Sequence, residues 1–140
     1  MIIMKGSTLD HKVIEKDEVK NIWNDVKDII SRTNNDVLNE KDILYYLEEG
    51  IYTLWIMTEP DSDNIVTAMI LNFGHYPRYK FCMIGPIAGE RMSEWIGDLS
   101  ILEEWAKSQG CHYIDLYGRR GWKKLLKEYK EDCILLRKKL

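Results

Sequence analysis

The sequence predicts an α+β fold in which a central, mostly antiparallel sheet is flanked by helices. Four segments carry apolar residues at the 3.6-residue spacing of amphipathic helices, and the segments between them are rich in β-branched and aromatic residues. These segments follow the order β-α-α-β-β-β-α-β-α-β. Because consecutive strands pair antiparallel and a strand-helix-strand crossover adds a parallel neighbour, this order favours one mixed sheet over a helical bundle or a β-sandwich.

The length and composition fit a single domain over residues 1–140. Hydrophobic residues make up 45% of the chain and charged residues 31%, which is typical of a globular protein and too apolar for a disordered one. The longest apolar runs are strand-sized and fall short of the roughly 20 residues of a membrane-spanning helix. The first residues also lack the apolar core of a signal peptide, so we expect a cytoplasmic protein without membrane association.

The first third is expected to contain a short strand followed by two helices. Residues 1–4 are apolar and predict the strand. Residues 15–31 predict an amphipathic helix, and residues 39–50 predict a second helix that Asn39 caps and Gly50 terminates. The apolar stripe of the first helix consists of Val19, Ile22, Trp23, Val26, Ile29 and Ile30.

The middle third predicts an antiparallel meander of three strands. Residues 51–58 and 65–73 flank a Pro-Asp-Ser-Asp-Asn turn, which is the pattern of a β-hairpin. A second turn around Pro77 leads to a third strand over residues 79–87. Since only short turns separate these strands, they are expected to be neighbours in the sheet.

The last third returns to helical spacing and then alternates. Residues 91–108 predict a long helix, residues 111–117 a strand, and residues 119–130 a basic amphipathic helix. A last strand is predicted over residues 133–136, which read Cys-Ile-Leu-Leu. The basic flank of the predicted helix consists of Arg120, Lys123, Lys124 and Lys127.

Positive charge is concentrated at the C-terminal end of an acidic chain. The net charge is −3, yet residues 119–140 carry nine Lys or Arg against three Asp or Glu. Such a segment can bind a phosphate-bearing ligand, a nucleic acid or an acidic protein, or it can simply be a solvated helix face. Nucleic acid is the least favoured partner, because the rest of the chain is acidic and no base-stacking module is present.

The three cysteines do not predict a metal site or a disulfide framework. Cys82, Cys111 and Cys133 are far apart, their number is odd, and no C-x-x-C pair occurs. All three lie in apolar, strand-like runs, so they are interpreted as core thiols in a reducing compartment. His11, His75 and His112 are equally scattered, and no metal ligand set is expected.

The element order resembles the GNAT superfamily of acetyl-CoA-dependent N-acyltransferases over nearly the whole chain. Residues 118–126 also read G-R-x-G-W-x-x-x-L, which is similar to a pattern in small phage-encoded GNAT-like proteins. The resemblance implies acetyl-CoA as the cofactor and an amine as the acceptor. It also implies that the motifs of the active members can be sought at defined positions of this sequence.

The first such motif is the phosphate-binding loop Q/R-x-x-G-x-G/A, whose backbone N–H groups bind the pyrophosphate of the cofactor. The matching stretch begins at Pro86, where Gln or Arg is expected, and has Gly89 at the first glycine and Arg91 at the second. The loop is therefore degenerate. The cofactor-binding candidates are the backbone around Ile84, Ile87 and Gly89 and the side chains of Arg91 and Arg120.

The second motif is the tyrosine that active members often place in the last helix as a general acid. The family spacing puts Leu126 at that position, so Tyr129 and Tyr117 are the nearby substitutes. The general base is sought on the strands, where Glu59 ends one strand and Asp115 interrupts an apolar one. The candidate catalytic residues are thus Glu59, Asp115 and Tyr129, with His75 as a further possible base.

Three functions follow from these observations. A degenerate loop and a missing tyrosine favour a GNAT-like domain that has lost catalysis and acts as a phage-type structural or host-interaction protein. Its expected partner is a protein, its expected location the host cytoplasm or the virion, and it needs no cofactor. The alternative is a working acetyl-CoA-dependent N-acyltransferase, and the third is a regulator that uses the basic helix. The sequence leaves the oligomeric state open.

Overall fold

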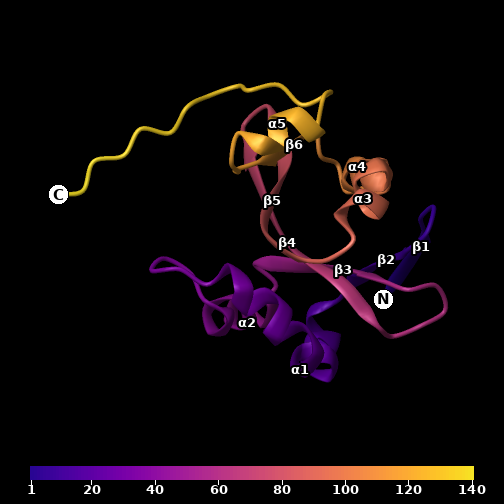
Figure 1. The fold of residues 1–140 in the computed structure, drawn as a ribbon. Helices are drawn as coiled ribbons and strands as arrows, with labels where there is room; N and C mark the ends of the chain where they lie inside the picture. The colour runs from indigo at the N-terminus through magenta and orange to yellow at the C-terminus, as the bar shows by residue number, and fades with distance from the viewer.

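The computed structural model describes residues 1–140 and contains one six-stranded sheet in the order β1-β2-β3-β4-β5-β6 (Figure 1). All neighbouring strands are antiparallel except β5 and β6, which are parallel. The predicted fold class is thus confirmed. The strands are β1 (Ile2–Lys5), β2 (Asp10–Ile14), β3 (Tyr52–Thr58), β4 (Ile65–Tyr76), β5 (Tyr79–Gly89) and β6 (Tyr113–Leu116).

Helices cover both faces of the sheet (Figure 1). The N-terminal pair, α1 and α2, covers one face, while α4 and the short helices α3 and α5 lie on the other. Three single-turn 3₁₀ helices extend or connect them. The helices are η1 (Lys16–Glu18), α1 (Val19–Ile30), η2 (Ser31–Thr33), α2 (Glu40–Glu48), α3 (Met92–Trp95), η3 (Ile96–Asp98), α4 (Leu99–Ser108) and α5 (Gly121–Leu125).

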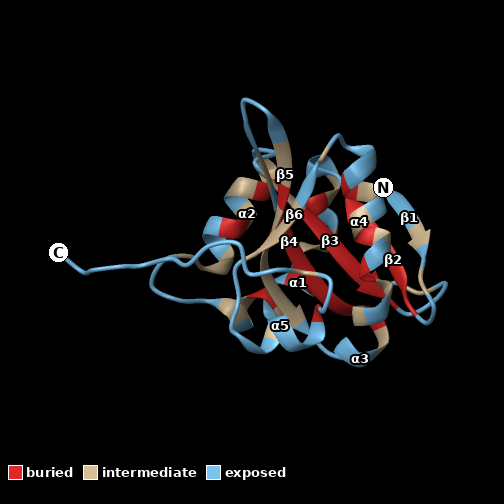
Figure 2. Ribbon diagram, turned by 90° about the horizontal axis from the view of Figure 1, so that it is seen from above, coloured by how far each residue is buried: buried red, intermediate tan, exposed pale blue.

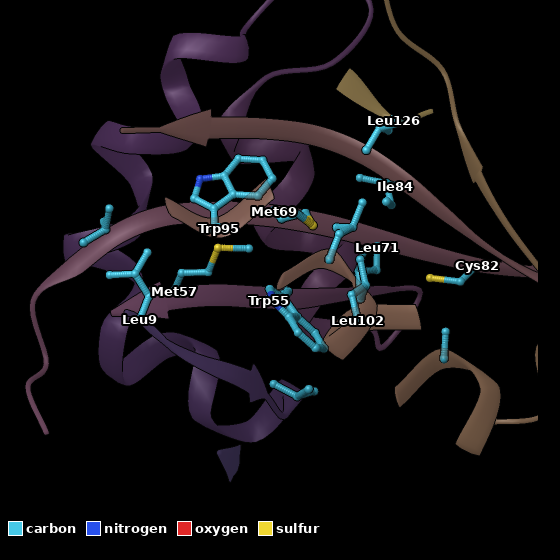
Figure 3. Packing of buried hydrophobic residues seen from close by; sticks show 14 residues of the cluster. Leu9, Trp55, Met57, Met69, Leu71, Cys82, Ile84, Trp95, Leu102 and Leu126 are labelled. Carbon is cyan, nitrogen blue, oxygen red and sulfur yellow. The ribbon is translucent and has the colours of Figure 1, made fainter. Parts of the chain in front are cut away.

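The sheet separates two hydrophobic cores, so its central strands are buried on both faces (Figure 2). Alternation along β3 divides them: Leu54 and Ile56 face α1 and α2, while Trp55 and Met57 face α4. The α1/α2 core consists of Ile14, Val19, Val26, Ile30, Ile43, Leu47, Leu54, Ile56, Ala68 and Ile70. The α4 core includes Leu9, Trp55, Met57, Met69, Leu71, Cys82, Ile84, Trp95, Leu102 and Leu126 (Figure 3).

The boundaries of α2 follow from the predicted capping chemistry. The Asn39 side chain accepts hydrogen bonds from the backbone N–H groups of Lys41 and Asp42, and the Asp42 side chain accepts one from the Asn39 N–H. This reciprocal arrangement is a capping box. At the other end Gly50 has a φ of +74°, a left-handed conformation that terminates the helix at little steric cost.

A bulge in β5 determines where the sheet opens. Met69 of β4 pairs with Ile87, but Leu71 pairs with Ile84, so two residues of β5, Gly85 and Pro86, lie opposite one residue of β4. Proline is tolerated at a bulge because a ladder hydrogen bond is missing there. On its other side β5 pairs with β6 only up to Ile84. Residues 85–89 therefore have a strand neighbour on one side only.

Two predictions for residues 1–108 need correction. Strand β2 was not anticipated, because three of its five residues are Asp10, His11 and Lys12; all five are buried since β1 and β3 flank the strand. The single helix expected over residues 91–108 is broken into α3, η3 and α4. The break lies at Ile96-Gly97-Asp98, where a glycine and an aspartate lower helix propensity.

The C-terminal prediction is wrong in two respects. The basic helix expected over residues 119–130 covers only Gly121–Leu125, because Leu126 leaves the helical conformation with a ψ of 73°. No strand forms over residues 133–136, because that segment lies beside no other strand. Cys133 is accordingly exposed and is not the core thiol that was expected, whereas Cys82 is buried and Cys111 is half-buried.

Candidate functional site

The first part of the candidate site is the stretch of β5 that extends beyond β6. The Ile84 side chain is 1% exposed and belongs to the α4 core, so only its backbone can face a ligand. Leu126 is buried in the same core, and Figure 3 shows it beside Ile84. An aliphatic side chain thus lies where the sheet opens, at the position at which the resemblance implied a tyrosine.

The second part is the loop between β5 and α3, which is anchored to the start of β4. Gly89 has a φ of +140°, and a Cβ atom there would lie 2.4 Å from the Val66 carbonyl oxygen. The N–H of Glu90 donates to that oxygen at 3.0 Å, and the Thr67 hydroxyl donates to the Glu90 carbonyl at 2.9 Å. Only glycine fits this close approach of two strands, so Gly89 has a structural role whatever the loop binds.

The loop leaves several backbone donors free. Arg91 adopts a left-handed conformation with a φ of 60°, and α3 begins directly after it. The N–H groups of Arg91, Met92 and Ser93 have no hydrogen-bond partner within the protein. Three consecutive unpaired N–H groups can donate hydrogen bonds to an anion, and this is the feature that the predicted phosphate-binding loop requires.

The Arg91 guanidinium is engaged by two carboxylates. Its Nη2 donates to Glu94 Oε1 at 2.8 Å and its Nη1 to Glu59 Oε1 at 3.1 Å, while its Nε also donates to Glu94. The hydrogen bonds from Arg91 hold the pKa of Glu94 below its ordinary value. The structure thus brings two predicted site residues together, but the positive charge predicted for a phosphate is balanced by carboxylates.

A polar pocket of about 220 Å³ adjoins this cluster at the ends of α1, β3 and β4. Two arginines and two glutamates line it, so its charges nearly cancel. Sequence analysis missed Arg32, which lies in a 3₁₀ turn with no motif around it. The lining residues are Ile29, Arg32, Glu59, Asn64, Ile65, Val66, Glu90 and Arg91.

Asp115 lies in β6, just before the strands separate. It pairs with Met83 and alternates with Ile114 and Leu116, which contribute to the α4 core, so its carboxylate lies on the opposite face. Burial and the nearby Asp132 raise its pKa. A half-buried carboxylate with a raised pKa and no ion pair is suited to accept a proton.

Glu59 and Asp115 lie too far apart to act on the same atom. Thr58, the residue before Glu59, pairs with Ile65 of β4, whereas Asp115 is linked through Met83 to Asn72 of β4. Seven residues along a strand correspond to about 23 Å. His75 lies still farther along β4, so this further candidate base cannot act on the same atom as Glu59 either.

The remaining two candidates lie on the α4 side. The Tyr129 hydroxyl donates to Glu103 Oε2 of α4 at 2.7 Å, and burial together with Glu103 raises the pKa of the phenol. Tyr129 therefore stays protonated and is held against α4. Arg120 is exposed at the start of α5. Neither residue is joined to the Gly89–Arg91–Glu59 cluster by a hydrogen bond or an ion pair.

A buried polar pair that sequence analysis missed lies under α4. The Trp55 Nε1–H donates to His11 Nδ1 at 3.2 Å, while His11 Nε2 is buried without a partner. Burial lowers the pKa of His11. Because Nδ1 accepts a hydrogen bond, the neutral ring carries its proton on Nε2. No spacing in the sequence pairs these two residues, which are 44 positions apart.

The structure contains no group of three or more His, Cys, Asp or Glu side chains able to hold a metal ion. Burial raises the pKa of Cys82 to about 12, so its thiol is inert. None of the helices has the length and apolar composition that crossing a bilayer requires.

Solved structures with the same arrangement are acetyltransferases. A GNAT family acetyltransferase from Staphylococcus aureus superposes with a TM-score of 0.66 at 14% identity, covering 95% of this chain and 99% of that chain. The chain has the GNAT fold. A predicted acetyltransferase from Clostridium acetobutylicum, solved with acetyl-CoA, gives a TM-score of 0.62 at 15% identity, covering 94% of this chain and 96% of that chain.

A third GNAT-fold enzyme, glucosamine-6-phosphate N-acetyltransferase from Arabidopsis thaliana, gives a TM-score of 0.61 at 15% identity, covering 95% of this chain and 99% of that chain. No protein-family model and no curated protein matches the sequence. The likeness to the GNAT fold is thus one of architecture, and it confirms the fold-level resemblance on which the site was predicted.

Proposed function

We propose that the chain is an acyl-CoA-dependent N-acyltransferase that binds acetyl-CoA along β5 beyond Ile84 and at residues 89–93. The observation that carries the proposal is the combination of a stretch of β5 that lacks a strand neighbour on its β6 side and three free N–H groups directly after it. This is what a thioester arm followed by a pyrophosphate needs from a protein: backbone partners first, then unpaired donors for an anion. A solved structure with the same fold contains acetyl-CoA.

Residues at the two ends of the opening beside β5 have different roles in this proposal. The N–H groups of Arg91, Met92 and Ser93 hold the phosphates, and Glu59 orients Arg91 beside them. Asp115, whose pKa is raised, accepts a proton from the acceptor amine. Acetyl-CoA, when bound, supplies an activated acetyl group. Leu126 is compatible with turnover because a thiol has a pKa near 8.5, so the leaving thiolate needs no strong acid.

The test of binding is thermal unfolding and calorimetric titration with acetyl-CoA. A ligand at about 100 times its Kd adds about 2.7 kcal/mol to the free energy of unfolding, which raises the Tm by several degrees. S93E places a carboxylate among the free N–H groups on an exposed position and is expected to weaken binding at least ~10-fold. S108E makes the same charge change at the far end of α4 and should bind like the unchanged protein.

Substitution of Gly89 is not a valid test of the cofactor site. Any side chain there would collide with the backbone of Val66 and Thr67, so the variant would lose stability before binding is measured. D115N is the better test of chemistry. It is expected to leave acetyl-CoA affinity unchanged and to lower the rate of acetyl transfer to an amine by about 10²-fold or more.

A second candidate function is a non-catalytic domain that binds a protein. It is favoured by the two carboxylates that already engage Arg91 and by the exposed carboxylate of Glu90 within the loop. No Tm shift at millimolar acetyl-CoA would favour this candidate, and binding of acetyl-CoA without transfer to any amine would favour a regulatory form of it. Nothing in the geometry supports the more specific role in a phage particle.

A further inference from the structure

An aromatic patch lies on the sheet face opposite α4, where β4 turns into β5. It consists of Tyr76, Tyr79, Phe81 and Tyr113, and none of these side chains belongs to either hydrophobic core. The Tyr76 ring centroid lies 5.1 Å from that of Tyr79 and 5.7 Å from that of Phe81, and Tyr79 lies 4.9 Å from Tyr113. Tyr76 and Tyr113 are each 57% exposed, because the turn between β4 and β5 lies away from α1 and α2 (Figure 1).

The strand register places this patch directly beside Asp115. In the parallel β5–β6 pair, Phe81 is opposite Tyr113 and Met83 is opposite Asp115. The intervening residues of both strands face the α4 core, so these four side chains lie together on the other face. The Phe81 ring also lies on Gly74 of β4, where a Cβ atom would be 2.5 Å from it. The patch therefore leads to the residue that accepts the proton in the proposed reaction.

The patch is apolar except for one carboxylate. Asp115 is the only charged side chain that the three strands place on this face, and Asp132 lies near enough to contribute to its raised pKa. No cation therefore belongs to the strand surface around Asp115. The residues on this face are Asn72, Gly74 and Tyr76 of β4, Tyr79, Phe81 and Met83 of β5, and Tyr113 and Asp115 of β6.

Two basic residues of the β4–β5 hairpin do not offset this charge. The Lys80 ammonium group lies on the α4 side, where it is 5.1 Å from the centroid of the Phe73 ring and donates to the Gln109 carbonyl. Arg78 lies in the turn, five residues before Met83 and thus about 16 Å from it along the strand. A carboxylate beside electron-rich rings attracts a cationic group, and without a nearby cation it disfavours a phosphate.

We propose that the aromatic patch is the acceptor site and that the acceptor is an arylalkylamine, a primary amine joined to an aromatic ring by a short aliphatic chain. The inference rests on the proposed acyltransferase function. The ammonium group pairs with Asp115 while the ring stacks on Tyr113 and Phe81. Tyr113 precedes Asp115 by two residues, about 7 Å along the strand, a separation that a short chain between ring and nitrogen can span.

The transfer then balances with the groups at this site. The bound ammonium group gives one proton to the Asp115 carboxylate. The amine nitrogen forms a bond to the acetyl carbon, the carbon–sulfur bond of the thioester breaks, and a second proton from nitrogen neutralises the leaving thiolate. The amide that forms has lost the positive charge that held the amine beside Asp115, which favours its release.

The first test compares acceptors with and without an aromatic ring. With acetyl-CoA in excess, kcat/KM for 2-phenylethylamine is expected to exceed that for ethylamine, and that for glucosamine 6-phosphate, by at least ~10-fold. Ethylamine lacks the ring, and glucosamine 6-phosphate carries a phosphate. Transfer to either of them as fast as to 2-phenylethylamine would overturn the inference and leave the acyltransferase function standing.

Substitutions of one exposed ring test its contact with the acceptor. Y113A is expected to raise the KM for 2-phenylethylamine ~10-fold and to leave kcat/KM for ethylamine unchanged, whereas Y113F keeps the ring and should behave like the unchanged protein. Y45A is the matched control, because Tyr45 is a 60%-exposed tyrosine of α2 that also contacts an aromatic neighbour, and it should affect neither amine. Equal losses for the two amines in Y113A would overturn the inference.

Calorimetric titration in the absence of acetyl-CoA separates this inference from the proposed function. The unchanged protein is expected to bind 2-phenylethylamine at least ~10-fold more tightly than 2-phenylethanol, which has the same ring without the charge. Binding of the amine without any acetyl transfer would overturn the acyltransferase function alone, because the patch would still recognise the amine. Equal affinity for the amine and the alcohol would overturn the inference, since Asp115 would then not contribute to recognition.

Discussion

The two faces of the sheet differ in the kinds of buried side chain that they contain. The face under α1 and α2 is almost wholly aliphatic, with Leu54, Ile56 and Ile70 at its centre and the Thr58 hydroxyl at its end. The face under α4 contains large, flexible or polar-bearing side chains, and three ring N–H groups there are buried without a partner. These side chains include Trp55, Met57, Met69, Trp95 and Cys82, and the three unpartnered groups belong to His11, Trp95 and Trp105.

The difference indicates that one face is stabilised by close packing of aliphatic side chains, whereas the other contains adaptable side chains and buried polar groups. Branched aliphatic side chains have few rotamers and fill a core tightly, so the α1/α2 face is expected to be rigid and intolerant of change. Methionine adapts to its surroundings, and an unpartnered buried N–H costs stability. The α4 face borders the opening beside β5, where a ligand would have to be accommodated. We expect the two faces to respond differently to equivalent substitutions.

The largest expected effect is a cavity on the aliphatic face. L54A is expected to lower the free energy of unfolding by about 3–5 kcal/mol, because the neighbours of this fully buried residue cannot collapse into the space. M57A, the fully buried counterpart on the other face of β3, is expected to cost less, about 2–3 kcal/mol. Urea unfolding of both variants measures this, and equal losses would contradict the proposed difference between the faces.

The next effect concerns the indole N–H groups of the α4 face. W55F removes the donor to His11 and leaves a buried acceptor unpaired, so a loss of about 1–3 kcal/mol is expected. W105F is the matched control. The Trp105 indole stacks against Trp55 at 5.5 Å between centroids, but its N–H has no partner, so its loss should cost clearly less. Equal urea midpoints for W55F and W105F would contradict the expected contribution of the hydrogen bond between Trp55 and His11.

The buried histidine makes the stability of the α4 face depend on pH. Burial lowers the pKa of His11 in the folded state, although Asp98 and Asp10 oppose this shift. As the pH falls below about 6.5, His11 is protonated in the unfolded chain before it is protonated in the folded protein. The free energy of unfolding therefore decreases until the pH has fallen below the folded-state pKa of His11. Urea unfolding between pH 8 and pH 5 should show this loss, and H11Q should remove it while the change due to carboxylates at lower pH remains.

The smallest effect is expected at Arg91, at the border of the α4 face. Its ion pairs are exposed, so they should contribute little to the free energy of unfolding. R91A loses them and keeps a left-handed backbone that a Cβ atom disfavours, whereas R91G relieves that strain. R91G should therefore be more stable than R91A by about 1 kcal/mol in thermal unfolding. If the two variants melt together, the left-handed conformation is not the one adopted in solution.

Most of the fold could be predicted from local patterns. The stripe in α1, the Asn39 cap and the Gly50 stop of α2, and the β3–β4–β5 meander each depend on residues close together in sequence, and each is confirmed. Strand β2 was missed because burial of its polar residues depends on two flanking strands. A strand was predicted over residues 133–136 because the sequence pattern indicates a high β-propensity. Such a pattern does not show whether a neighbouring strand is present to pair with the segment.

The site was predicted less completely than the fold, because its geometry is made by distant contacts. Gly89 was singled out by the phosphate-loop motif that the resemblance implies, but the reason that only glycine fits, the approach of Val66 and Thr67, is tertiary. The ion pairs of Arg91 with Glu59, and the 23 Å or so that separate Glu59 from Asp115, follow from strand register.

The sequence by itself determined the periods of α1 and of the β3–β4–β5 meander, the ends of α2, and the excess of positive charge at the C-terminus, because these are properties of neighbouring residues. The tertiary structure decided which polar groups meet, where β5 loses its second neighbour, and which edge stays open. The physical reason is that hydrogen-bond partners and burial are set by strands and helices far apart in the chain, and no local spacing encodes their distance.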